Sequence, residues 1–146
     1  MYAQQGLFDQ ALTEYAQALE LDPGSFLARY NRGALHAGQG DYKSAIEDFS
    51  AAVELNPVFV EAYYHRGLAY ADLGEYRQAE TDLSKVLELN PTDLQAYFNR
   101  GLIRMELGER VEARRDFERA LSLTVDPQLR QIITLQIEAA KSKEQT

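Results

Sequence analysis

The chain has 146 residues, of which 45% are hydrophobic, a size that supports one domain with a continuous core. Its formal net charge of −8 and pI near 4.8 would repel a phosphate backbone, so nucleic acid is not an expected partner. The absence of cysteine excludes disulfides, thiolate metal sites and a cysteine nucleophile.

The N-terminal sequence MYAQQGLFDQ lacks the basic and apolar regions of a secretory signal. No later stretch approaches the roughly 20 apolar residues of a membrane span. We therefore expect a cytoplasmic protein with no membrane insertion. In this first region, residues 7–21 are predicted to form an amphipathic helix, preceded by a short helical segment, 2–5, and a turn at Gly6.

The next two predicted helices, 26–39 and 41–55, carry apolar residues at three- and four-residue steps. Between them, Gly40 supplies a left-handed turn and Asp41 an acidic start for the second helix. Pro57 ends that helix, because proline disfavours helical geometry in the preceding residue, Asn56.

This pair of helices recurs, because shifting the sequence by 34 residues superposes its small residues. Glycine costs about 1 kcal/mol inside a helix, so its return at one helical position predicts close approach of two helices there. Further along, Thr92 and Gln95 predict a capping box at the start of the third pair. The residues in register include Gly33, Gly67 and Gly101; Gly6, Gly40, Gly74 and Gly108; and Ala11, Ala45, Ala79 and Ala113.

After the last pair, Asp126 and Pro127 predict the start of a closing helix. Its apolar set is expected to pack inward and its outer face to be polar, as the end of a stacked array requires. That apolar set comprises Leu129, Ile132, Ile133 and Ile137.

The 34-residue pattern resembles the tetratricopeptide repeat (TPR) family, most clearly through Gly33, His36, Gly40, Tyr42, Ala45, Phe49, Ala52 and Pro57. The third full unit departs from that pattern at Arg104, Arg110 and Val125. The resemblance implies an all-α fold: a right-handed superhelical solenoid of antiparallel helix-turn-helix repeats with a C-terminal capping helix. The predicted organisation is a single domain, 1–146, with a partial repeat 1–25, full repeats 26–59, 60–93 and 94–126, a capping helix 127–142 and a tail 143–146.

An arginine and an aspartate also recur, sixteen residues apart. In an antiparallel hairpin that turns near Gly40, Gly74 or Gly108, the two positions lie at roughly the same level, so a structural ion pair is predicted. The alternative is that the arginines bind an anionic ligand. The predicted pairs are Arg32 with Asp48, Arg66 with Asp82, and Arg100 with Asp116.

In the family that the sequence resembles, the first helix of each repeat lines a concave peptide-binding groove. Carried over by position, this implies an aromatic series beside a polar series, although the aromatic side chains could instead be buried between repeats. The implied groove residues are Tyr30, Asn31, Tyr64, His65, Leu68, Phe98, Asn99 and Leu102.

Some family members bind a C-terminal carboxylate through basic groove residues. Here those positions hold Tyr30, Glu61, Tyr64, His65, Gln95 and Asn99. An apolar, neutral or mildly basic segment of another protein is therefore the expected partner, rather than an acidic tail.

Catalysis is not expected, because the only histidines, His36 and His65, lie at different repeat positions and lack metal-ligand spacing. No cofactor, metal site or catalytic residue is predicted, and the leading function is a non-enzymatic adaptor or scaffold. The competing reading is an assembly module that docks onto further repeats or another copy through its N-terminal helices. That homo-oligomeric interface would use Leu7, Phe8, Leu12 and Tyr15.

Overall fold

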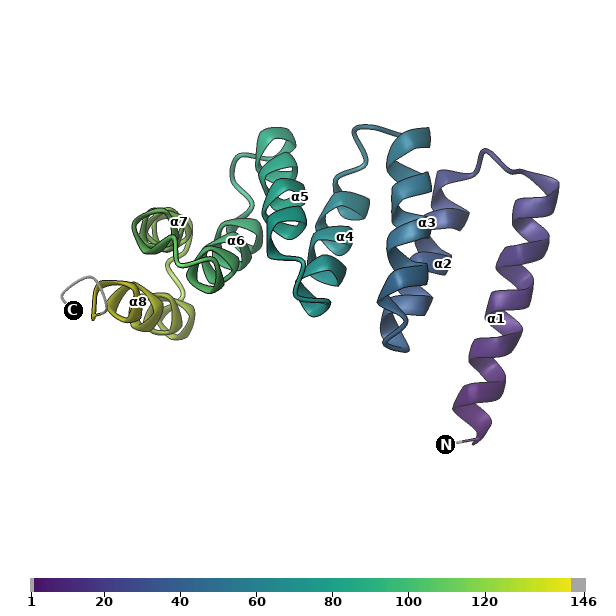
Figure 1. The fold of residues 1–146 in the computed structure, drawn as a ribbon, viewed down its shortest axis with the longest axis horizontal. Coiled ribbons are helices and arrows are strands. Elements are labelled where there is room, and N and C mark those ends of the chain that lie inside the picture. The colour runs from purple at the N-terminus through teal and green to yellow at the C-terminus, as the bar shows by residue number, and fades with distance from the viewer. Residues whose placement is uncertain (1, 143–146) are drawn as a thin grey trace. The chain divides into compact units, whose positions relative to one another are not determined.

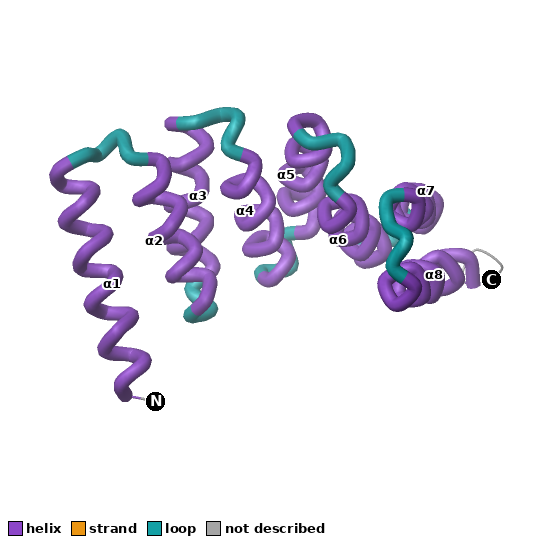
Figure 2. The backbone as a smooth tube through the Cα atoms, turned by 180° about the vertical axis from the view of Figure 1, so that it is seen from behind, coloured by secondary structure: helices purple, strands orange, loops and turns teal. Residues whose placement is uncertain are grey.

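The computed structural model describes residues 2–142, which contain eight α-helices and no strand (Figures 1 and 2). The predicted all-α fold is confirmed, while the tail 143–146 lies outside the described residues. No helix in 2–142 combines the length and apolar content needed to cross a bilayer. Between Leu73 and Gly74 the chain divides into two compact units. That boundary falls inside the predicted repeat 60–93, so the single-domain organisation stays a prediction.

Unit 1 contains α1 (Tyr2–Leu21), α2 (Phe26–Gly38), α3 (Tyr42–Leu55) and α4 (Val60–Asp72). Helix α2 packs against α1 and α3, and α3 packs against α4. The hairpin turn between α2 and α3 is built as predicted: Gly40 has φ +78°, and the Asp41 carboxylate accepts a hydrogen bond from the Ser44 N–H at 3.2 Å. The fully buried core of this unit is made by Ala45, Phe49, Ala52 and Ala62.

Helix α1 differs from the expected short segment, turn and second helix. It continues through Gly6, which lacks the positive φ of Gly40, Gly74 and Gly108. A separate segment 2–5 would be shorter than a stable helical nucleus and would have little surface to pack. In one continuous helix, the backbone groups on both sides of Gly6 form helical hydrogen bonds, so Gly6 is a helical residue here.

Unit 2 contains α5 (Tyr76–Leu89), α6 (Leu94–Glu106), α7 (Arg110–Ser122) and α8 (Pro127–Ser142). Helix α6 packs against α5 and α7, and α7 packs against α8. The core around α7 and α8 is formed by Ala113, Phe117, Ala120, Ile133 and Ile137.

The predicted capping box at Thr92 is wrong. Asp93 is the N-cap of α6, and its carboxylate accepts a hydrogen bond from the Ala96 N–H at 3.0 Å. The Thr92 hydroxyl instead donates to the side chain of Asn90 at 3.3 Å. An aspartate one position later competes successfully because its carboxylate reaches the free N–H groups of the first turn.

Helix α8 closes unit 2, but its outer face is not entirely polar. Ile133 is fully buried, whereas Ile132 is 50% exposed and Leu135 is 63% exposed. Residues four apart share a face, whereas a neighbour one position away points about 100° around the helix. Ile132 therefore lies outside the stripe that α7 covers.

Within each hairpin, a helical glycine permits close approach of the second helix. A Cβ added to Gly33 would lie 2.9 Å from the ring of Phe49, and one added to Gly101 would lie 2.5 Å from the ring of Phe117. Both phenylalanines are fully buried and have no room to retreat. The recurring glycine thus leaves space for the recurring aromatic side chain.

Candidate functional site

The candidate site in unit 1 lies where α2 and α4 meet over α3. Its base is the fully buried Phe49, whose ring centroid is 5.8 Å from that of Tyr30 and 6.2 Å from that of His65. Tyr30 and His65 are themselves 5.8 Å apart, and Tyr64 packs edge-on against His65 at 5.3 Å. We call Tyr30, Phe49, Tyr64 and His65 the aromatic cluster. Its outer members are half-buried, so they serve core packing and also present a surface.

A pocket of about 310 Å³ opens beside the aromatic cluster. Two of the groove residues implied by the sequence, His65 and Leu68, line it, while Asn31 is exposed on α2. The other lining residues include Ala34 and Ala37 from α2, Phe49 from α3, and Ala69 and Asp72 from α4. The pocket therefore has an apolar floor and an exposed carboxylate among its lining residues.

Burial among these rings changes the protonation of the site. It lowers the pKa of His65, and the nearby Glu61 carboxylate opposes that shift only in part. Burial, followed by the charge of Glu61, raises the pKa of Tyr30. At neutral pH both side chains are consequently uncharged, and the aromatic cluster presents neutral hydrogen-bonding groups.

In unit 2, the three implied groove residues lie on α6. The ring of Phe98 is half-buried and packs 5.7 Å from the fully buried Phe117, a relation close to that of Tyr30 and Phe49 in unit 1. Leu102 packs against the same core, and Asn99 is half-buried. The structure thus brings Tyr30, Tyr64, His65 and Leu68 together in unit 1, and Phe98 and Leu102 against one core in unit 2.

The Arg32 and Asp48 side chains form a bidentate ion pair across the α2–α3 hairpin. Nε and Nη2 of Arg32 donate to the two carboxylate oxygens at 2.7 Å each, and Asp48 is only 5% exposed. The hydrogen bond to Asp48, against a smaller opposing effect of burial, raises the pKa of Arg32. This geometry commits the guanidinium to the hairpin rather than to an anionic ligand.

The α6–α7 hairpin contains the same bridge. Arg100 donates to the buried Asp116 through Nε at 2.9 Å and Nη2 at 2.7 Å. The remaining predicted partners, Arg66 and Asp82, belong to different units, so their pairing stays a prediction. Within unit 1, Arg66 donates to the Ser50 hydroxyl at 3.2 Å.

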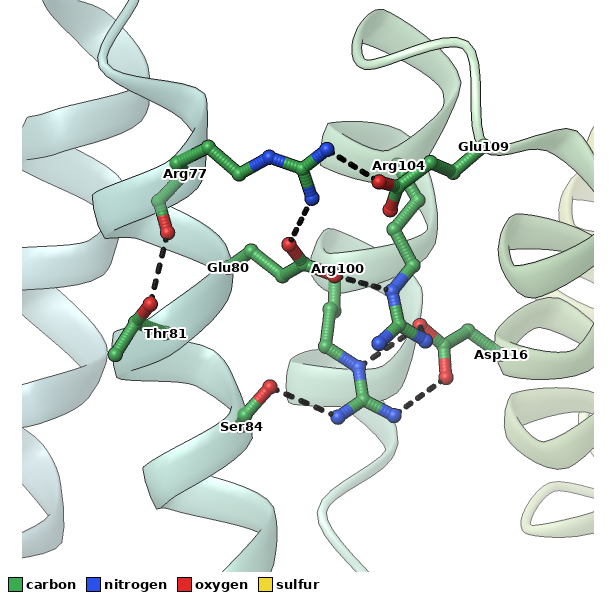
Figure 3. A network of polar contacts seen from close by, with 8 residues as sticks. All are labelled: Arg77, Glu80, Thr81, Ser84, Arg100, Arg104, Glu109 and Asp116. Carbon is green, nitrogen blue, oxygen red and sulfur yellow. Dashed lines mark hydrogen bonds and ion pairs between the residues drawn. The ribbon is translucent and has the colours of Figure 1, made fainter.

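Unit 2 extends its bridge into a larger network that sequence reasoning missed (Figure 3). Arg104 donates to Asp116 at 2.9 Å and to Glu80 of α5 at 2.8 Å, and Arg77 joins Glu80 to Glu109. Burial acts to raise the pKa of Glu80, but hydrogen bonds from Arg104 and Arg77 outweigh it and lower that pKa. The network ties α5, α6 and α7 together.

Two signals in the sequence point toward this network. Arg104 departs from the repeat pattern, and the residue at the same position of the first full repeat, His36, also lies near its buried aspartate, with Nε2 4.0 Å from Asp48. In addition, Ser50 and Ser84 are 34 residues apart, and Ser84 accepts a hydrogen bond from Arg100 at 3.1 Å. Each serine hydroxyl thus accepts a hydrogen bond from the arginine sixteen residues later in the chain.

Helix-turn-helix pairs with a glycine–aromatic crossing and a turn glycine define this chain as an α-helical repeat protein. Family models described as tetratricopeptide repeat match residues 2–58 together with 35–76, residues 60–93, and residues 94–124. The chain belongs to the tetratricopeptide repeat family. No match was found among curated proteins.

Solved structures with this fold include proteins bound to peptides. The crystal structure of MamA is 25% identical, with a TM-score of 0.81 over 98% of this chain and 92% of that one. The first TPR of Spaghetti (RPAP3), bound to the HSP90 peptide SRMEEVD, is 26% identical, with a TM-score of 0.76 over 83% of this chain and 94% of that one. The second TPR domain of human RPAP3, in complex with the HSP70 peptide SGPTIEEVD, is 26% identical, with a TM-score of 0.71 over 77% and 92% of the two chains.

Proposed function

We propose that this protein is a non-enzymatic interaction scaffold that holds a segment of a partner protein against α2 and α4 of unit 1. In unit 2, α6 carries its own set of implied contact residues. The observation that carries the proposal is the 310 Å³ pocket beside the aromatic cluster. Half-buried aromatic rings with an apolar hollow and a few polar groups are typical of interface hot spots. A preformed scaffold also limits the entropy lost when the partner binds.

The solved TPR structures of RPAP3 support peptide binding as the kind of activity, but their peptides end in acidic residues. Helix α4 offers Glu61, Tyr64 and His65 at positions where a carboxylate clamp needs basic side chains. We therefore propose an apolar, neutral or mildly basic segment as the partner. A cytoplasmic adaptor role fits this activity.

The test compares the proteins retained from a lysate of the native cells by the wild-type chain and by the double variant Asn31→Lys, Leu68→Ala. Asn31 is exposed and Leu68 lines the pocket, so the double variant alters the site while leaving the buried core residues intact. We expect it to lose a partner that the wild type retains. The matched control is Lys43→Ala on the exposed side of α3, and circular dichroism verifies folding. Equal retention by the double variant and the wild type would rule out this site.

A second candidate function is assembly through α1. Leu7 is 66% exposed, and a hollow of about 410 Å³ is lined by Gln4, Leu7, Phe8 and Leu35 between α1 and α2. Leu12 and Tyr15, the other two predicted interface residues, are half-buried. Exposed apolar side chains beside a hollow favour docking of another helix, from a second copy or from further repeats.

Sedimentation equilibrium distinguishes this second candidate. Self-association through α1 would give a dimer that Leu7→Lys converts to a monomer. A wild-type chain that stays monomeric throughout the micromolar range would remove the homo-oligomeric form of this candidate.

A further inference from the structure

Two carboxylates flank the candidate site of unit 1 on a single face of α4. Glu61, His65, Leu68 and Asp72 follow one another at steps of four, three and four residues, so they form one stripe along the helix. Resting on the proposed function, we infer that this stripe selects a partner segment with two basic side chains, one for each carboxylate, and an apolar side chain between them for the pocket.

Separate observations connect each carboxylate with the site. Glu61 is close enough to influence both Tyr30 and His65 electrostatically. Asp72 lines the same pocket as His65 and Leu68. The two acids therefore lie at opposite ends of one binding surface.

No lysine or arginine of the described residues neutralises either carboxylate. Both are exposed, and neither forms an ion pair within residues 2–142. Three arginines of unit 1 contact other residues: Arg29 and Arg32 pair with Asp48, and Arg66 donates to Ser50. The negative charge on the α4 stripe is thus available to a partner.

The middle of the stripe suits an apolar or aliphatic group. His65 is neutral at physiological pH because burial lowers its pKa, so it does not repel a neighbouring cation. The pocket floor consists mainly of Ala34, Phe49 and Leu68. Its lining also includes Gly38 and Asp72, the last residues of α2 and α4, where the partial negative charge of a helix C-terminus favours a cation.

The geometry sets the spacing of the basic side chains. Glu61 and Asp72 are eleven positions apart, which is about 16 Å along a helix that rises about 1.5 Å per residue. An extended segment rises about 3.3 Å per residue, so its two basic residues should be about five positions apart. The arrangement belongs to α4: the corresponding positions hold Leu27 and Gly38 in α2, and Gln95 and Glu106 in α6.

The test uses a random twelve-residue peptide library selected on the 146-residue chain. We expect the retained peptides to share two Lys or Arg residues about four to six positions apart, with an apolar residue between them. Binding of one such labelled peptide, measured by fluorescence anisotropy, should weaken about two- to five-fold on Glu61→Gln or on Asp72→Asn, and further in the double variant. Raising the salt concentration should weaken wild-type binding more than binding by the double variant.

The matched control is the double variant Glu47→Gln, Glu54→Gln, which removes the same charge from exposed positions of α3. If it weakens binding as much as the Glu61 and Asp72 double variant, the effect is one of net charge and the inference is overturned. Selection of acidic or uncharged peptides that still require Leu68 would overturn the inference and leave the proposed function standing. A library from which the wild type retains nothing would overturn both.

Discussion

At the scale of single residues, the glycines inside the first helices are set by what faces them. Gly33 and Gly101 lie against Phe49 and Phe117, and the phenylalanine rings occupy the space where a side chain would begin. The turn glycines have a different requirement, since Gly40 has open space around it but a φ of +78°. Glycine is thus required at some positions because no side chain would fit and at others because the backbone has a positive φ.

We predict that Gly33→Ala and Gly101→Ala lower the free energy of unfolding by about 1 to 3 kcal/mol, because overpacking a filled core exceeds the gain in helix propensity. The loss should be greater at Gly101, where the added Cβ would meet Phe117 at 2.5 Å rather than 2.9 Å. Urea unfolding followed by circular dichroism measures both. The control is Gly38→Ala in α2, which meets nothing within 4 Å and should be neutral or stabilising. Equal effects at all three positions would contradict the packing argument.

The titration of His65 makes the free energy of unfolding of unit 1 depend on pH. Burial lowers the pKa of His65 in the folded chain below the usual value of 6.5, and Glu61 opposes this only in part. Between the folded and unfolded pKa values, the unfolded chain binds a proton that the folded chain does not. The contribution of His65 to the free energy of unfolding therefore falls as pH drops from about 7 through the folded pKa, and it is constant above that range.

We predict that His65→Gln removes this part of the pH dependence. Urea midpoints of the wild type and the variant, compared between pH 7.5 and pH 5.5, isolate the histidine because the two chains share every other titrating group. The wild type should lose more stability than the variant over this interval. Parallel pH profiles would show that His65 titrates alike in the folded and unfolded states.

At the scale of helices, some N-cap residues form a side-chain hydrogen bond to the first turn and others do not. Ser25, Asp41 and Asp93 accept hydrogen bonds from first-turn N–H groups of α2, α3 and α6, whereas Phe59 at the start of α4 provides no such side-chain bond. Acceptance of hydrogen bonds from the Ser44 hydroxyl and N–H lowers the pKa of Asp41. Capped and uncapped starts occur at equivalent repeat positions, so packing of the apolar faces sustains the uncapped helices.

The cap of α6 is directly testable. We predict that Asp93→Ala costs about 1 kcal/mol of unfolding free energy, because it leaves an N–H of the first turn without its acceptor. Thr92→Ala is the neighbouring control and should change stability by less than about 0.5 kcal/mol. Thermal and urea unfolding of both variants provide the measurement. A larger loss at Thr92 would restore the capping box as the start signal.

The helix pattern could be read from the sequence because each repeat restates it. Gly40 and Pro57 mark helix limits by backbone chemistry alone, and the sixteen-residue interval from Arg32 to Asp48 follows from folding the chain back at Gly40. Periodicity could not decide between Thr92 and Asp93, because the choice depends on the backbone angles at the helix start. Periodicity also could not exclude Ile132 from the buried face of α8, because the sequence does not show how much of that helix α7 covers.

The site was less accessible to sequence reasoning than the fold. Repeat position implied His65 and Leu68 as groove residues, and both line one pocket, whereas their role in binding stays a prediction. The partners of Arg104 depend on where Glu80 of another helix points, and no periodic rule specifies that. Likewise, the dual role of Tyr30 as packing residue and surface emerges only from its contacts with Phe49 and His65.

At the scale of the whole molecule, the chain has two compact units, each with its own buried residues. Stability in a repeat array is approximately a sum over repeats and their nearest neighbours. A defect near one end should therefore weaken the structure locally before it affects distant repeats.

We predict that Ile133→Ala increases hydrogen exchange in α7 and α8 while leaving α2 and α3 nearly unchanged. Ile133 is fully buried, so its truncation should cost about 2 to 5 kcal/mol. The adjacent Ile132 is 50% exposed, and Ile132→Ala should have little effect on exchange anywhere. Mass spectrometry of deuterated peptides gives the readout by segment. Uniform loss of protection along the chain would indicate a single cooperative unit instead.

The arginine–aspartate bridge has one more consequence, for transplantation of these hairpins. Both partners of the Arg32–Asp48 bridge lie in one helix pair. Residues 26–56 would therefore keep this ion pair if they were transferred into another repeat protein. Arg100 and Arg104 also reach back to Ser84 and Glu80 of α5, so residues 94–123 would arrive in a new host with two bonds undone. The first hairpin thus keeps its arginine–aspartate bridge and loses the Arg66–Ser50 hydrogen bond to α4, whereas the second loses two hydrogen bonds to the helix before it.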